Sequence, residues 1–174
     1  MTSSSSPKRR ILIINADDLG YSQARDMGIF LAFQNGCVTS ASLIVNGFTS
    51  NTAAKEAIRL GLPLGLHLNL TEGEPIAKSV HSIVVRNGDV SVFRGKLGFR
   101  IACEKGQVEE NEVEAEILAQ IHEFKRLTSG KTPTHVDGHQ HCHLLSFTRE
   151  IFAKTLKTAG IFRTRLPIEA PLFL

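Results

Sequence analysis

The sequence predicts a single α/β domain in which a mainly parallel sheet is covered by outer helices. Short apolar runs alternate along the chain with segments of helical periodicity, which is typical of right-handed βαβ units. Polar clusters follow several of these runs, at the strand ends where such folds carry their functional residues. With 174 residues, 42% of them hydrophobic, the chain is long enough for one domain with a core.

In the first part of the chain, apolar runs, a helix-capping serine and terminating glycines define the elements. The third strand alternates leucines with Gly65, His67 and Asn69, so these three residues share the face away from the leucines. The predicted elements are a strand at 10–15, a helix at 22–35, a strand at 38–45, a helix at 51–60 and a strand at 64–70.

In the second part, Asn87-Gly88 between two β-rich runs predicts a hairpin. A long helix follows, with apolar residues at helical spacing and glutamates in its first turns. The predicted elements are hairpin strands at 83–86 and 89–92, a helix at 109–127, a strand at 135–137, a helix at 148–159 and a fifth strand at 161–166.

The composition narrows the classes of partner and compartment. We interpret residues 1–9 as a flexible tail, 10–169 as the α/β domain and 170–174 as an apolar tail. A formal charge of +3, one tyrosine and no tryptophan argue against a nucleic-acid-binding surface, and no apolar stretch has membrane-spanning length. Three widely spaced cysteines favour a reducing compartment, so we expect a cytoplasmic protein. A homo-oligomer is left open.

Two adjacent carboxylates, Asp17 and Asp18, follow the first apolar run. Like charges one residue apart repel unless a cation or a shared proton offsets the repulsion. His67 lies in the third strand, and four histidines lie between residues 135 and 143, of which His139 is best placed just past a strand end. Together Asp18, His67 and His139 predict a divalent-metal site with room for water.

Further polar residues lie at or near the same strand ends and are candidates for binding substrate or orienting the ligands. His135 sits inside its predicted strand and is the candidate for orienting a metal ligand. The full set is Asn46, Asn69, His135, Asp137, His141 and Arg163.

The stretches at 15–21, 35–47, 65–71 and 134–141 resemble the YdjC-like carbohydrate deacetylases, which include chitooligosaccharide deacetylase. The resemblance implies a barrel-like α/β fold, a divalent ion (usually Mg²⁺, with Zn²⁺ in some members) and hydrolysis of N-acetyl groups on amino sugars. By the family pattern the metal ligands are Asp18, His67 and His139, and the catalytic base is Asp17.

Family members continue beyond the point where this chain stops, so we expect a partial (β/α) barrel of low stability with an open sheet edge. Two alternatives to the deacetylase stay open. One is a catalytically impaired, truncated form that acts as a binding or regulatory chain. The other is phosphoesterase chemistry on the same ligands, although the sequence lacks a Gly-rich phosphate loop. No residue is assigned as the general acid.

Overall fold

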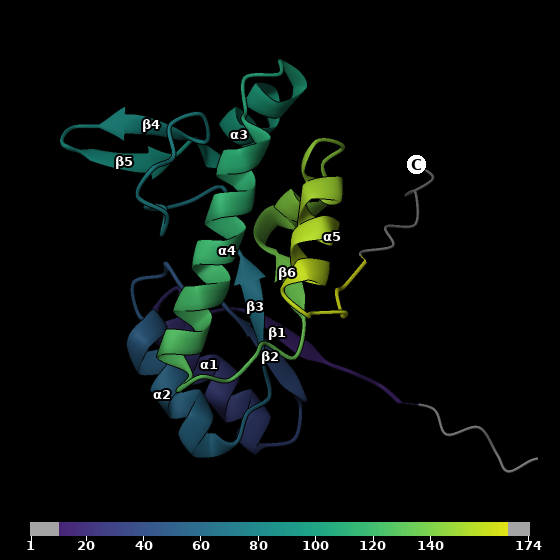
Figure 1. Ribbon diagram of the computed structural model, residues 1–174. Coiled ribbons are helices and arrows are strands. Elements are labelled where there is room, and N and C mark those ends of the chain that lie inside the picture. The colour runs from purple at the N-terminus through teal and green to yellow at the C-terminus, as the bar shows by residue number, and fades with distance from the viewer. Residues whose placement is uncertain (1–10, 167–174) are drawn as a thin grey trace, which may run out of the picture.

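The computed structural model describes residues 11–166, so the predicted tails at 1–9 and 170–174 lie outside the described part. The predicted α/β fold is confirmed: the chain forms a partial (β/α) barrel of parallel strands with helices outside and a small hairpin (Figure 1). The sheet has the order β1-β2-β3-β6, where the strands are β1 (Asn15–Leu19), β2 (Ser40–Leu43), β3 (Leu64–Leu68) and β6 (Val136–Gly138).

Five α-helices and one 3₁₀ helix connect and cover these strands within residues 11–166. The long helix α4 packs on β3 and against α2 and α5, and α3 lies beside the hairpin at one end of the molecule (Figure 1). No described helix is both long and apolar enough to cross a membrane. The helices are α1 (Gln23–Gln34), α2 (Ser50–Leu60), α3 (Gly95–Glu104), α4 (Glu110–Leu127), α5 (Thr148–Thr158) and the 3₁₀ helix η1 (His139–Leu144).

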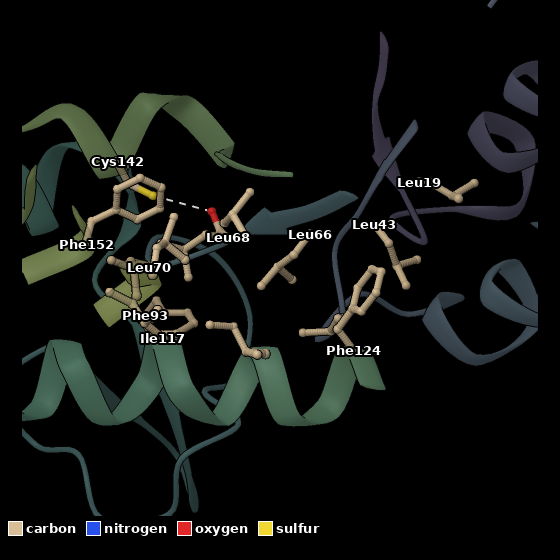
Figure 2. Close-up of a cluster of buried hydrophobic side chains, with 14 of the residues drawn as sticks. Leu19, Leu43, Leu66, Leu68, Leu70, Phe93, Ile117, Phe124, Cys142 and Phe152 are labelled. Atoms are coloured by element: carbon tan, nitrogen blue, oxygen red, sulfur yellow. Dashed lines mark hydrogen bonds between the residues drawn. The ribbon is translucent and has the colours of Figure 1, made fainter. Parts of the chain in front are cut away.

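The strand β3, in the middle of the sheet, is buried along its whole length. Its leucines lie on one face and His67 on the other. Leu66 and Leu68 belong to the same buried cluster as Ile117 and Phe124 of α4 (Figure 2). Burying one such side chain contributes about 1.5–3 kcal/mol. Because side chains alternate along a strand, fixing the leucine face directs His67 to the opposite face.

The hairpin is formed by β4 (Val84–Asn87) and β5 (Val90–Phe93), as predicted. Its turn is displaced by one residue from the predicted position, because Asn87 pairs with Val90 and the loop residues are therefore Gly88 and Asp89. Gly88 has φ 63°, a conformation that glycine adopts without steric cost.

Two predicted strands differ from the structure, and both lie at the margins of the sheet. Residues 11–14 were predicted as part of a buried strand, but Ile11 is 80% and Ile14 42% exposed, and β1 begins at Asn15. Among the described residues no strand lies on the far side of β1, so these apolar side chains have nothing to pack against. Residues 161–166 also form no strand, although the carbonyl of Arg163 accepts a hydrogen bond from Val136.

Candidate metal centre

A bulge in β1 turns both aspartates toward the same end of the sheet. Ala16 pairs with Ala41 and Leu19 with Leu43, so β1 carries one residue more than β2 over this interval. Such a bulge re-aims side chains that would otherwise alternate between faces. Asp18 sits inside it at φ 63°, a left-handed conformation that costs about 1–2 kcal/mol for most residues and that Asp tolerates better.

Three predicted ligands converge on one point beyond the strand ends. His139 Nδ1 lies 2.9 Å and His67 Nε2 lies 3.2 Å from Asp18 Oδ1, and one ligand atom from each residue lies within 4.8 Å of the others. Hydrogen bonds from His139 and His67 hold the pKa of Asp18 far below its usual range. Asp18 is therefore a carboxylate, the form that binds cations.

His67 is oriented from behind by a second carboxylate. Its Nδ1 lies 2.7 Å from Oδ1 of Asp137, which is 0% exposed, and the hydroxyl of Ser42 lies 3.3 Å from the same nitrogen. Burial alone would lower the pKa of His67, but hydrogen bonds to Asp137 and Asp18 raise it to about 9. This arrangement leaves Nε2 as the nitrogen that faces Asp18.

His139 is placed by an irregular connection after β6. Gly138 lacks a side chain where a Cβ atom would lie 2.2 Å from Nδ1 of His143, so glycine is required for this close approach. Gln140 and His141 then adopt φ 53° and 58°, which breaks the 3₁₀ helix into two parts. The chain therefore turns sharply directly after His139.

Asp17 is held by an arginine that follows α5. Arg165 donates two hydrogen bonds to its two carboxylate oxygens, at 2.8 and 2.7 Å, and its Nη2 lies 3.1 Å from Asp137. Burial by itself would raise the pKa of Asp17, but the hydrogen bond from Arg165 and the charge of His67 bring it below its usual value. The predicted candidate Arg163 is exposed, so Arg165 is the arginine that reaches this site.

The two predicted asparagines, Asn46 and Asn69, form hydrogen bonds to the loop that follows β3 and not to the metal ligands. The side chain of Asn69 donates to the carbonyl of Glu72 at 2.8 Å and accepts from the Glu72 backbone N–H at 3.0 Å. Asn46 donates to the same carbonyl at 3.1 Å. Glu72, which is not among the candidates predicted from the sequence, extends its carboxylate to within 3.2 Å of His139 Nε2. Its only signal in the sequence is its position three residues after Asn69.

The remaining two histidine candidates lie at the periphery of the centre. His135 packs its ring against Gly65, and its Nε2 is 3.9 Å from Asp137, farther than a hydrogen bond. Burial lowers the pKa of His135. His141 is exposed and lines a groove of about 500 Å³ with Lys96 and Arg100. Gln140 belongs to this groove as well, which therefore adjoins the centre.

The donor set fits a divalent ion. One ionised carboxylate and two imidazoles are the ligand types of zinc and other first-row ions, and three protein ligands leave coordination positions for substrate or water. The left-handed Asp18 supports this, because strain at a non-glycine residue clusters at functional sites. We conclude that Asp18, His67 and His139 could hold such an ion.

The chain resembles known proteins over most of its length. A family model described as YdjC-like protein matches residues 11–173. Carbohydrate deacetylase of Mus musculus is 45% identical over 158 residues, covering 91% of this chain and 51% of the relative. Chitooligosaccharide deacetylase of Serratia marcescens is 38% identical over 136 residues, covering 78% and 51%.

A solved structure from Enterococcus faecalis V583, described as a putative cellobiose-phosphate cleavage protein, matches with a TM-score of 0.71 and 26% identity. That match covers 86% of this chain and 56% of the other. The chain spans about half the length of the curated relatives it matches. The family model covers almost the whole chain, and the chain belongs to the YdjC-like protein family.

Proposed function

We propose that this chain carries the metal centre of a carbohydrate deacetylase, which hydrolyses N-acetyl groups of amino-sugar oligosaccharides. The observation that carries the proposal is the meeting of Asp18, His67 and His139 at one point, with Asp17 beside them on the same bulge. Relatives named carbohydrate deacetylase and chitooligosaccharide deacetylase, which match over the same region, support it.

Asp17 is the proposed base. Its pKa is lowered, so it is ionised at neutral pH. Its Oδ1 accepts hydrogen bonds from Arg165 and Asn15, whereas Oδ2 accepts from Arg165 and can accept one more. Asp17 takes the proton of the attacking water as the water oxygen bonds to the acetyl carbon. The carbon–nitrogen bond then breaks, which gives acetate and an amine that must gain a proton. We assign no general acid among residues 11–166.

A bound divalent ion would polarise the acetyl carbonyl and activate water, and Asp18, His67 and His139 would hold it. The family resemblance favours Mg²⁺, whereas two imidazoles among three ligands favour Zn²⁺. Asp137 orients the proposed ligand His67 through its hydrogen bond with Nδ1. Arg165 keeps Asp17 charged and turned toward His67.

The proposal also covers the compartment, the substrate and the association of copies. Cys37, Cys103 and Cys142 are all free thiols, which supports a reducing compartment such as the cytoplasm. The substrate is an acetylated carbohydrate, and the exposed apolar residues before β1 favour association of copies. The alternative, an impaired chain that only binds a partner, predicts metal binding without turnover.

Acetate release from N-acetylglucosamine oligomers, measured with added Mg²⁺ or Zn²⁺, tests the function. Asp17→Asn should lower the rate by about 10²–10⁴-fold and leave metal binding unchanged, because it removes a base and not a ligand. Asp89→Asn in the exposed hairpin loop makes the same charge change and should have no effect. Metal binding without acetate release by the unsubstituted chain would favour the impaired alternative.

A further inference from the structure

The two histidines of the candidate centre share one arrangement. Each has one ring nitrogen at Asp18 and the other at a carboxylate outside the centre: His67 has Asp137 at 2.7 Å, and His139 has Glu72 at 3.2 Å. A histidine that binds a metal usually donates its second N–H to such an outer partner, which fixes the tautomer and the ring orientation. For His139 the outer partner comes from a loop that is distant in sequence.

We propose that Glu72 is the positioning residue of His139, and that it accepts the Nε2–H so that Nδ1 faces the metal. The proposal rests on the proposed function, because it assumes that His139 binds a divalent ion. Glu72 itself stays outside the ligand set. Its task is the one that Asp137 performs for His67.

The backbone of Glu72 is held by several hydrogen bonds. Asn69 and Asn46 both donate to its carbonyl, and the Asn69 side chain also accepts its N–H. Asn69 is anchored in turn by Gln120 of α4, which donates to its carbonyl at 2.6 Å and accepts its N–H at 3.0 Å. The carboxylate therefore projects from a fixed point although its side chain is 38% exposed.

The rest of the loop is fastened to the same helix. Glu116, which is 0% exposed, accepts backbone N–H groups of Ile76 and Ala77 at 3.0 and 2.7 Å. Glu112 accepts the N–H of Ser82 at 2.6 Å. Successive side chains on one face of α4 thus hold the segment between β3 and β4. A loop fixed at this many points can set the orientation of a ligand.

Gln140 completes the contact between the loop and the centre. Its amide donates to Glu72 Oε1 at 2.6 Å, while Glu72 Oε2 faces His139. The Gln140 Oε1 atom is buried and has no hydrogen-bond partner in the described part of the chain. A flip of this amide would let it accept from an N–H at position 72, so Glu72→Gln can keep its oxygen on His139.

The test measures Zn²⁺ affinity by competition with a chromophoric chelator, on the full chain. Glu72→Ala should weaken binding by about 10–100-fold, as removal of outer partners does at other metal sites. Glu72→Gln should stay close to the unsubstituted chain. Glu74→Ala is the matched control, since it removes the same charge from an exposed residue of the same loop and should leave affinity unchanged.

A second readout reports the tautomer directly. In ¹⁵N NMR spectra of the Zn²⁺-loaded chain, His139 should show a protonated Nε2 and a metal-bound Nδ1, and Glu72→Ala should disturb this pattern. Metal-free thermal unfolding controls for folding. Unchanged affinity of Glu72→Ala, or a metal-bound Nε2 in the unsubstituted chain, would overturn the inference while leaving the proposed function intact. Failure of the unsubstituted chain to bind Zn²⁺ would overturn both.

Discussion

Replacing Gly65 by alanine should destabilise the fold, because the ring of His135 occupies the place of the new methyl group. A Cβ atom built at residue 65 would lie 2.3 Å from Cε1 and 2.5 Å from Nε2 of His135. The ring cannot move freely, since its Nδ1 lies 2.9 Å from the hydroxyl of Thr134 and the residue is partly buried against β3. Overpacking of this kind costs about 1–3 kcal/mol.

A glycine in open space gives the matched control. Gly28 lies inside α1 with no atom within 4 Å of its ideal Cβ position, so Gly28→Ala should stabilise the chain by about 0.5–1 kcal/mol. The same chemical change thus has opposite signs at the two sites. Urea unfolding curves give both free energies, provided that the slopes of the curves agree.

The double variant Gly65→Ala/His135→Ala identifies the cause. If the histidine ring is what the new methyl group meets, removing it should recover most of the loss, with a coupling of about 0.5–3 kcal/mol. A Gly65→Ala chain as stable as the unsubstituted one would refute the packing described for His135. So would a double variant in which the two losses simply add.

Three further predictions concern the aspartates, pH and the sheet edge. Asp18→Asn should weaken Zn²⁺ binding measured by calorimetry, because it removes a charged ligand; unchanged binding would exclude Asp18 from the centre. With a chelator present, the stability that His67 contributes is complete below its ordinary pKa of 6.5 and is lost as pH rises toward its folded pKa of about 9. The free energy of unfolding should therefore fall as pH rises through that window, and it should fall less in His67→Gln. Equal pH slopes for the two chains would contradict the raised pKa of His67. Ile13 is 72% exposed beside β1, so Ile13→Lys should reduce concentration-dependent association in sedimentation experiments, whereas a monomeric unsubstituted chain would oppose this.

Much of the site follows from local sequence patterns. The alternation around His67 fixed its face, and the position of Asp17 and Asp18 after an apolar run placed them at a strand end. What local patterns do not contain is the extra residue of the β1 bulge, which lets neighbouring aspartates turn to one side. A bulge arises from the pairing of one strand with another, and the sequence of a single segment does not determine that pairing.

The residues that were missed depend on contacts across the fold. Glu72 reaches the centre from a segment whose path is set by α4, so it does not stand out locally. Arg163 and Arg165 both lie near a predicted strand end, and the local pattern does not show that Arg165 is the one that reaches Asp17. Helix α3 was missed as well, since its Gly95 and Gly98 weaken the helical signal. Residues 11–14 were instead predicted as buried and are exposed. An apolar composition indicates that a segment tends to be buried, but it does not show that a neighbouring element is there to cover it.

X-ray absorption spectroscopy of the Zn²⁺-loaded chain can show whether Asp18, His67 and His139 hold a divalent ion. The spectrum should show two imidazole nitrogens and oxygen ligands at about 2.0–2.2 Å, with no sulfur. The imidazole signal should weaken in His67→Ala and in His139→Ala. Sulfur ligands at about 2.3 Å would place the ion on the free cysteines instead, and a spectrum without imidazole would contradict the account.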